Sequence, residues 1–444
     1  MEKVVAYILN RFPSFRDRID VHMLEVINGA AVALVLKVLG AGLTFLFNLV
    51  LARKLGAEGA GLYFLALTVT TIATVFGRMG LDNTLLRFTA ANVAVEDWPA
   101  VKGAYTKGMR MALIASFLST IALFVFAPVL ADRVFHKQEL VSPMRWMSLA
   151  VMPMTFVMLY SQVLKGLKRI RDSFIVVGIG VPGISLTALL LFGGSYGVKG
   201  GVMAYVLGAI LTAVIGVILW YIATPQLRKV SASFRTNDLL KSSMPLFWVA
   251  SLNMMVAWTA TFALGIWGTE EEVGLFSMAS RTAMLTSLIL TSVNSISAPK
   301  FAELYKKKDM AALGATARNT ARMMTFVASP MLLLFLVAPE WVMGLFGDEF
   351  RKSGILLSIL AIGQFVNVAT GSVGYLLMMS GNEKLMRNNV SFVAVLSVVL
   401  NAALVPLYGA FGAVIATAVC LASQNLIAMY MVNSRLGINI ISWP

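Results

Sequence analysis

The chain has 444 residues, of which 59% are hydrophobic and only 13% are charged, and its formal net charge is +15 at pH 7. Soluble domains carry about 25% charged residues, so this composition excludes an ordinary water-soluble protein and fits a lipid bilayer. One cysteine and two histidines exclude an internal disulfide and leave no basis for a Cys/His metal site.

The chain begins with a polar segment, residues 1–28. Arg11, Arg16 and Arg18 interrupt it, so it lacks the continuous apolar core of a cleavable signal peptide. We expect an amphipathic segment at the membrane surface.

Twelve apolar stretches follow, each close to the roughly 20 residues that a helix needs to cross a bilayer. They cover residues 30–52, 61–86, 108–130, 145–164, 174–193, 200–223, 243–266, 274–298, 321–345, 354–379, 388–408 and 410–433. No connection between them is long enough for a soluble domain. The predicted fold is therefore an all-α integral membrane protein with twelve transmembrane helices.

Short motifs return about 213 positions later in the chain. Gly61-Leu62-Tyr63-Phe64 returns as Gly274-Leu275-Phe276-Ser277, and Arg87-Phe88 returns as Lys300-Phe301. Each half holds six predicted spans, an even number, so both halves enter the membrane in the same orientation. A membrane chain built from two similar halves places its substrate path between them. The sequence thus predicts a transporter.

The predicted organisation is two parallel six-helix lobes, with a linker between them and a short tail. The N-lobe covers 29–223, the cytoplasmic linker 224–242, the C-lobe 243–435 and the cytoplasmic tail 436–444.

The basic residues predict the orientation. Most of the 36 lysines and arginines lie at the N-terminus and in loops after even-numbered spans. By the positive-inside rule both termini are cytoplasmic, in a multi-pass protein of the inner (cytoplasmic) membrane. The positive charge is mainly a topology signal, so nucleic acid is not an expected partner.

Three cations fall inside predicted spans: Lys37 in span 1, Arg78 in span 2 and Arg281 in span 8. Charge within a membrane is costly, so each is a candidate functional residue. Fixed cations favour an anionic passenger, and an arginine can bind phosphate oxygens with two parallel hydrogen bonds. Spans 2 and 8 are repeat partners, so Arg78 and Arg281 should face each other if both point inward.

Each cation also has a simpler interpretation. Lys37 can extend along the lipid to the cytoplasmic interface. Arg78 can pair with Asp82, which lies one helical turn away. Arg281 has no acid one turn away within its span, although the glutamates at 270–272 lie further toward the outside. Arg281 is therefore the preferred candidate.

Further candidates lie at the span ends and among uncharged polar residues. Arg87 and Lys300, at matching repeat positions, can gather an acidic headgroup at the cleft mouth, or simply set topology. The other candidates are uncharged residues within spans 1, 7 and 8 that can bind sugar hydroxyls or hydrogen-bond between helices. They are Asn48, Asn253, Asn294 and Trp258.

No Gly-rich phosphate loop and no catalytic constellation occurs within the spans, so neither direct ATP use, a cofactor, a metal nor enzymatic activity is expected. A structural scaffold without a passenger remains an alternative, as does a membrane glycan polymerase or ligase.

Two motifs carry a resemblance to a known family. Leu51-Ala52-Arg53-Lys54-Leu55-Gly56-Ala57-Glu58-Gly59-Ala60-Gly61-Leu62-Tyr63 leads into span 2, and Ala298-Pro299-Lys300-Phe301 precedes the lysines at 306–308. With the two six-span halves, the chain resembles the polysaccharide-biosynthesis flippases from about residue 28 to 435. These are the O-antigen and exopolysaccharide repeat-unit transporters of the multidrug/oligosaccharidyl-lipid/polysaccharide exporter superfamily.

The resemblance implies a V-shaped, MATE-like pair of lobes around a central cationic cavity lined mainly by spans 1, 2, 7 and 8. It implies a flippase that moves a polyprenyl-diphosphate-linked oligosaccharide from the inner to the outer leaflet by alternating access. By position, Lys37, Arg78 and Arg281 resemble the cavity cations of lipid-linked peptidoglycan-precursor flippases. Those relatives generally have fourteen spans, and cation-coupled relatives tend to carry an acid in span 7 or nearby, whereas this chain has none in spans 7, 11 and 12.

The expected partners are the lipid-linked substrate and membrane lipid, with a glycan polymerase complex as a further candidate and a monomer as the transport unit. The alternatives within the superfamily are a cation-coupled multidrug exporter and a lipid-linked peptidoglycan-precursor flippase.

Overall fold

The computed structural model describes residues 21–192 and 196–440 and is almost entirely helical over them, without strands. Most of the predicted amphipathic segment, residues 1–20, lies outside the described residues, as do residues 441–444 of the predicted tail.

Among the residues that the structure describes, the N-lobe contains eight helices. They are α3 (Val21–Arg78), α4 (Leu81–Ala94), α5 (Trp98–Val129), α6 (Val141–Ser148), α7 (Val151–Gly166), α8 (Ile170–Phe174), α9 (Val181–Phe192) and α10 (Gly197–Ala223). The C-lobe is built from eight more. They are α11 (Thr236–Trp267), α12 (Glu270–Ala283), α13 (Ser287–Lys306), α14 (Met310–Val337), α15 (Pro339–Gly344), α16 (Gly354–Ala369), α17 (Val373–Met379) and α18 (Glu383–Leu436).

Short 3-10 and π-helical segments join or extend these helices. They are η1 (Leu130–Val134), η2 (Gln138–Leu140), η3 (Ile175–Gly180), η4 (Pro225–Arg228), η5 (Met284–Thr286) and η6 (Asp348–Ser353). The linker predicted at 224–242 thus contains η4 and the start of α11.

Over the described part of the chain, the helices are long and apolar enough for twelve membrane crossings. Within the described residues, nine helical segments are long and apolar enough to cross, and a tenth crossing is the bent pair Gln138–Ser148 and Val151–Gly166. Two of the nine are double crossings, because α3 and α18 each contain one non-helical glycine, Gly56 (φ 68°) and Gly409 (φ 52°). The 58 residues of α3 would extend about 87 Å without that break, nearly three times the ~30 Å hydrocarbon core.

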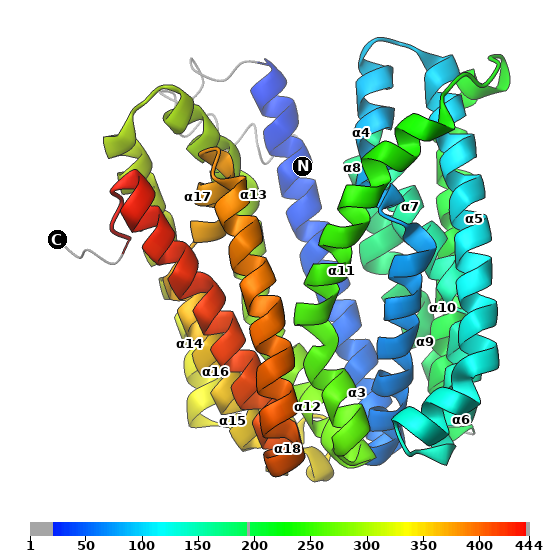
Figure 1. Cartoon of the computed structure of the whole chain (residues 1–444), viewed down its shortest axis with the longest axis vertical. Helices are drawn as coiled ribbons and strands as arrows, with labels where there is room; N and C mark the ends of the chain where they lie inside the picture. The colour runs from blue at the N-terminus through cyan, green and yellow to red at the C-terminus, as the bar shows by residue number, and fades with distance from the viewer. Residues whose placement is uncertain (1–20, 193–195, 441–444) are drawn as a thin grey trace.

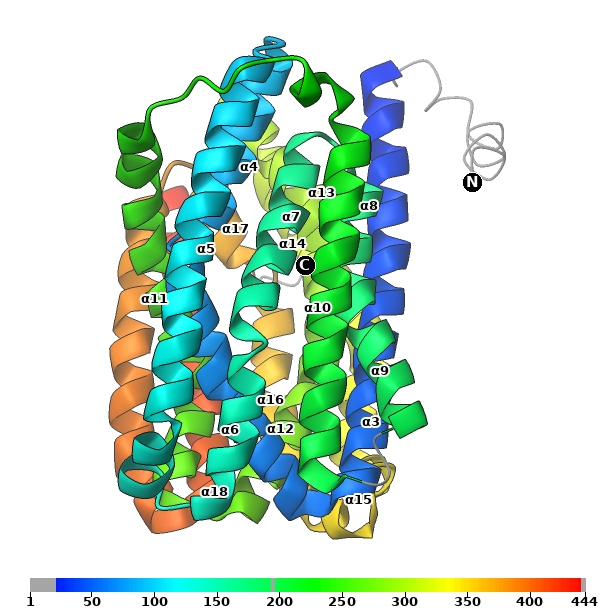
Figure 2. The same ribbon diagram turned by 90° about the vertical axis from the view of Figure 1, so that its right-hand side faces the viewer.

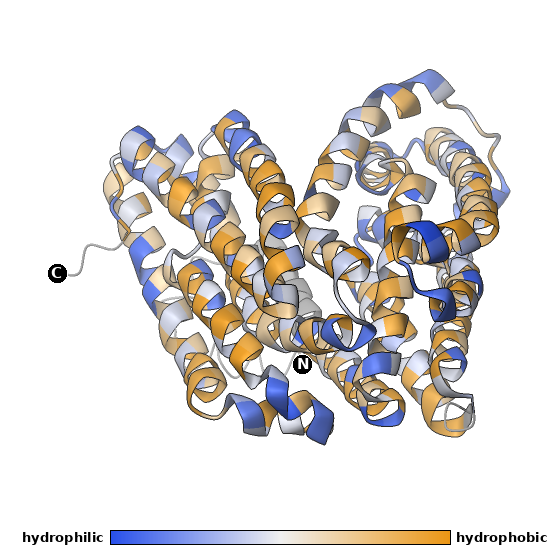
Figure 3. Ribbon diagram, turned by 60° about the horizontal axis from the view of Figure 1, so that its bottom comes forward, coloured by the Kyte–Doolittle hydropathy of each residue, from blue (hydrophilic) through white to orange (hydrophobic). Residues whose placement is uncertain are grey.

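The crossings form two bundles, of which the N-lobe bundle lies in front in Figure 2, and the bundles separate toward one end of the molecule (Figure 1). We call this the basic end; it contains α4, the 224–235 connection and the α13–α14 turn. The opposite end contains Gly56, α6, α15 and Gly409. Helix α3 begins and α18 ends toward the basic end, as the even number of crossings per lobe requires (Figure 1). Hydrophilic residues gather in the connections, whereas the long helices are mostly hydrophobic (Figure 3).

Two predicted spans are interrupted, which corrects the expectation of continuous helices. Span 2, expected over 61–86, ends at Arg78, because Met79 (φ 47°) and Gly80 (φ 70°) turn the chain before α4. A Cβ on Gly80 would lie 2.3 Å from the carbonyl oxygen of Ser243, so α11 approaches too closely for another residue. Span 8, expected over 274–298, changes to a 3-10 turn at η5 between α12 and α13.

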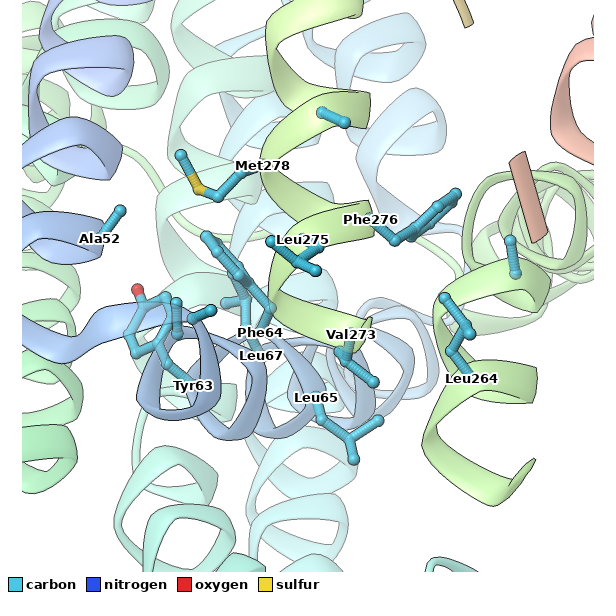
Figure 4. Close-up of a cluster of buried hydrophobic side chains, with 14 of the residues drawn as sticks. Ala52, Tyr63, Phe64, Leu65, Leu67, Leu264, Val273, Leu275, Phe276 and Met278 are labelled. Carbon is cyan, nitrogen blue, oxygen red and sulfur yellow. The ribbon is translucent and has the colours of Figure 1, made fainter. Parts of the chain in front are cut away.

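The lobes meet at the opposite end through two glycines. A Cβ on Gly61 of α3 would lie 1.7 Å from the carbonyl oxygen of Glu270, and one on Gly274 of α12 would lie 2.0 Å from that of Ala57. The two helices therefore touch backbone to backbone. Buried side chains of α3, α11 and α12 surround this crossing, including Phe64 and Leu275 (Figure 4).

Polar contacts between the lobes reinforce this crossing. The Nε of Arg53 donates to the carbonyl oxygen of Leu345 (2.8 Å), and the amide of Ala57 donates to Oε2 of Glu349 (2.8 Å). In the other direction, Nζ of Lys137 donates to the carbonyl oxygen of Gly268 (2.8 Å). Each lobe thus binds the backbone at a helix break of the other lobe, Gly56 in one case and Gly268 in the other.

Candidate transport site

Arg281 lies on the last turn of α12 and reaches across the lobe interface. Its guanidinium carbon is 4.5 Å from the centre of the Phe64 ring on α3, a cation–π contact. The ring of Tyr63 lies 5.3 Å from that of Phe64 and 6.5 Å from that of Tyr205. None of the ion pairs among the described residues involves Arg281. Its charge thus contacts the Phe64 ring and is not neutralised by a carboxylate among the described residues.

Two cavities meet at Arg281. The first, the inter-lobe cavity, has a volume of about 230 Å³ and lies between Ala41, Thr44 and Asn48 of α3 and Leu288 of α13. The second, the C-lobe cavity, has a volume of about 520 Å³ and lies among α11, α12, α16 and α18. Because Arg281 lines both, an anion in either cavity can reach a fixed positive charge.

Lys37 lies at the margin of the inter-lobe cavity. It precedes Ala41 by one turn of α3, and its Nζ donates to Oγ1 of Thr291 on α13 at 2.6 Å. This hydrogen bond joins the two lobes on the basic-end side of the cavity. Lys37 therefore contacts the other lobe through a hydroxyl, and Thr291 is a partner that the sequence did not indicate.

Arg78 lies elsewhere, at the junction of α3 and α4. Its Nη1 is 3.1 Å from Oδ2 of Asp82, and the two side chains are 19% and 14% exposed. The Nε of Arg78 is buried without a hydrogen-bond partner. Fourteen residues of helix separate Arg78 from Phe64, about 21 Å, so the structure does not bring Arg78 and Arg281 together.

Arg87 and Lys300 are exposed at the basic end and have different partners. The Nη2 of Arg87 donates to Oγ of Ser242 on α11 (3.0 Å), and its guanidinium lies 4.9 Å from the Phe88 ring. Lys300 pairs with Glu303 on its own helix at 3.0 Å. The matching repeat positions therefore do not form matching contacts.

The uncharged candidates fall in separate places. Asn48 lines the inter-lobe cavity, and Trp258 lines the C-lobe cavity. Asn294 is buried, and its Oδ1 has no hydrogen-bond partner among the described side chains. Asn253 donates to the carbonyl oxygen of Val249 (3.0 Å) and lines a third cavity, which it shares with Arg387. Asn48 and Trp258 are thus the two that share a cavity with Arg281.

Other residues around Arg281 were not among the sequence candidates. Phe64 and Tyr205 come from the N-lobe, whereas Gln364 and Ser277 line the C-lobe cavity. One sequence signal could have found Ser277, because the repeat aligns it with Phe64 and so marks a change from a large aromatic to a small polar residue.

The fold and the site define a class of protein: a two-lobed, multi-span membrane protein with an uncompensated arginine at its lobe interface. The family model described as "Polysaccharide biosynthesis protein" matches residues 26–305, and the chain belongs to this family.

Curated relatives are distant but extend along most of the chain. The probable low-salt glycan biosynthesis flippase Agl15 of Haloferax volcanii is 22% identical over 409 residues, which cover 90% of this chain and 82% of the relative. The stage V sporulation protein B of Bacillus subtilis is 22% identical over 363 residues, which cover 74% of this chain and 67% of the relative.

Solved structures of the MATE and MurJ transporters share the two-lobe membrane fold. An inward-facing multidrug resistance MATE family transporter of the MOP superfamily matches with a TM-score of 0.70 at 17% identity, covering 92% of this chain and 98% of that one. The lipid II flippase MurJ in an inward closed conformation matches with a TM-score of 0.70 at 12% identity, covering 90% and 87%.

Proposed function

We propose that this protein is a flippase that moves a polyprenyl-diphosphate-linked oligosaccharide from the inner to the outer leaflet by alternating access. The observation that carries the proposal is Arg281, an intramembrane cation without a carboxylate partner that lines both cavities at the lobe interface. A charge is retained at such a depth where it has a function.

The chemistry of Arg281 favours a phosphate group. A guanidinium presents paired N–H donors that match two phosphate oxygens, and the interaction is stronger away from bulk water. The same positive charge opposes a cationic drug, which argues against the multidrug alternative. The family assignment and the relatives named as probable flippases support a lipid-linked glycan as the passenger.

The contacts between the lobes suggest how access alternates. At the opposite end the lobes are held by the crossing of Gly61 and Gly274 and by the bonds of Arg53, Lys137 and Glu349. We propose that the basic end faces the cytoplasm, that the described state admits the headgroup from there, and that release outward requires the opposite-end contacts to break. The diphosphate would pass from Lys37 to Arg281.

A leaflet-resolved assay tests the proposal. Purified protein in vesicles is given a fluorescent prenyl-diphosphate sugar, and a quencher reports its leaflet. We expect Arg281→Ala and Arg281→Lys to reduce the rate about 10- to 100-fold, because a hydrogen bond to a charged group contributes ~1.5–3 kcal/mol. Arg351→Ala is the control, since Arg351 is 65% exposed and pairs with Asp348 on the same turn. Undiminished transport by Arg281→Ala would remove this residue from the mechanism.

A further inference from the structure

The C-lobe cavity has the size of a ligand site. Its volume is about 520 Å³, within the ~300–1,000 Å³ of typical small-molecule pockets. Protein interiors are packed with few voids larger than a water molecule. A hollow of this volume among the helices of one lobe therefore requires an explanation.

The sequence repeat shows how the hollow arises. Ser277 and Ser280, which line the cavity, align at the 213-residue offset with Phe64 and Leu67 of the N-lobe. Phe64 and Leu67 are buried members of the hydrophobic core. Small polar residues thus stand in the C-lobe at the positions where the N-lobe has large, buried apolar residues. These cavity-lining residues differ between the lobes and are not a property of the shared fold.

The walls of the cavity carry polar groups without protein partners. Ser277 and Thr261 are 5% and 6% exposed, and their hydroxyls, like the side-chain amide of Gln424, take part in none of the protein's hydrogen bonds among the described residues. Both hydrogen bonds of Gln364, from Ser287 and Asn367 (3.2 Å each), use its carbonyl oxygen. The NH₂ group of Gln364 is therefore left to donate. Buried polar groups without partners are costly, so a polar ligand or water must serve them.

The charges on the walls limit what that ligand is. Among the described residues that line the cavity, Arg281 is the one charged residue, and none is acidic. A metal ion or an organic cation would find no carboxylate there. Hydroxyls that both donate and accept, together with amide donors and the indole of Trp258, suit a polyhydroxylated ligand. An adjacent positive charge suits a negative group at one end of it.

We propose that the C-lobe cavity is a glycan subsite, which holds the first sugars of the substrate while the diphosphate lies at Arg281, between this cavity and the inter-lobe cavity. The inference rests on the proposed flippase function and adds the place where the sugar is recognised. It predicts that sugar-bearing and sugar-free prenyl diphosphates differ in whether they occupy this cavity.

Cys420 provides a native reporter of that occupancy. It is the single cysteine of the chain, it lines the cavity, and it is 3% exposed. In the reconstituted full-length protein, the rate of its modification by N-ethylmaleimide measures access to the cavity. We expect a prenyl-diphosphate disaccharide to slow the modification at least about tenfold. The same prenyl diphosphate without sugar should leave the rate within about twofold. A tenfold change corresponds to a free-energy difference of ~1.4 kcal/mol.

Two variants sharpen the test. Gln364→Leu removes the amide donor and should weaken protection by the sugar-bearing lipid about tenfold, as expected for loss of one or two ligand hydrogen bonds. Ser277→Phe installs the residue of the N-lobe and should abolish both the modification of Cys420 and its dependence on sugar. The control is Ser358→Ala, also on α16, whose hydroxyl faces away toward Phe335 (3.1 Å to its carbonyl oxygen).

The outcomes are separable from those of the transport assay. In the wild-type protein, equal protection by both lipids, no protection by either, or no modification of Cys420 at all would overturn the subsite. If wild-type protein also moves the labelled lipid in that case, the flippase function stands and the sugar binds elsewhere. If no lipid is moved and none protects Cys420, both proposals fail.

Discussion

Gly61 and Gly274 stand on opposite sides of one helix crossing, and each is the repeat counterpart of the other. A Cβ on either glycine would overlap the backbone of the facing helix. The crossing therefore lies on the approximate symmetry axis that relates the lobes, at the end away from α4. A contact on such an axis joins equivalent surfaces of the two lobes, so it closes this end of the molecule until the lobes separate there.

Enlarging either glycine should force the lobes apart at this point. We expect Gly61→Leu and Gly274→Leu each to lower stability by about 1–3 kcal/mol, the usual cost of overpacking, and to widen the opposite end. Thermal unfolding in detergent and a spin-label distance between the lobes measure the two effects. The control is Gly42→Leu, because a Cβ at Gly42 meets no atom within 4 Å. Equal effects at all three positions would contradict a special role for the crossing.

The carboxylate of Glu349 should stabilise the helix break at Gly56. It accepts from the amide of Ala57 at 2.8 Å, and a charged acceptor contributes more than a neutral one, ~1.5–3 against ~0.5–1.5 kcal/mol. We expect Glu349→Gln to accelerate hydrogen exchange at Ala57 about tenfold. Mass spectrometry of peptides covering residues 55–60 makes the measurement.

The neighbouring acid supplies a matched control for that experiment. Asp348→Asn removes a carboxylate that is 91% exposed and pairs with Arg351 on the same turn, so exchange at Ala57 should stay unchanged. If Asp348→Asn accelerates exchange as much as Glu349→Gln, the effect reflects net charge and not the bond to the break.

Lys37 and Thr291 should act as a coupled pair. Their hydrogen bond of 2.6 Å joins the lobes, so removing either partner loses the same interaction. We expect Lys37→Met, Thr291→Val and the double variant to change the transport rate non-additively, with a coupling of about 0.5–3 kcal/mol. A double-mutant cycle on the vesicle assay tests this. Strict additivity would show that Lys37 acts without Thr291.

Arg78 and Asp82 should contribute mainly to stability. The pair is partly buried, so Asp82→Asn leaves Arg78 without its counter-charge and should cost about 1–3 kcal/mol. Replacing both, as Arg78→Met with Asp82→Leu, should recover most of that loss, because apolar replacements of a buried pair are often near neutral. Thermal unfolding follows the stability. A double variant that is stable but does not transport would give Arg78 a role in binding.

Hydropathy predicted the architecture because crossings of a bilayer must be long and apolar whatever their neighbours. The positions of Gly56 and Gly409 agree with the predicted connections between spans 1 and 2 and between spans 11 and 12. The turn at Met79 and Gly80 was not predicted, since it depends on the approach of Ser243 from α11. The approach of Ser243 to Gly80 joins residues far apart in the chain, so a local sequence pattern does not predict it.

The site was predicted in part, for a similar reason. Arg281 was selected as a candidate because a charge in an apolar segment is visible without knowledge of the fold. Its neighbours Phe64 and Tyr205 are ordinary apolar or aromatic residues in their own helices, and only tertiary packing brings them to the guanidinium. Arg78 shows the converse, because its local pairing with Asp82 was one of two predicted outcomes and is the contact observed.

The reciprocal bonds at the opposite end have a consequence for assembly. Lys137 of the N-lobe donates to the peptide oxygen of Gly268 in the C-lobe, and Glu349 of the C-lobe accepts from the amide of Ala57 in the N-lobe. Because these hydrogen bonds position the two lobes relative to each other, we expect the lobes to associate correctly without the covalent connection between α10 and α11. Two co-expressed fragments, cut within residues 229–234, should find each other in the bilayer and restore the intact transporter.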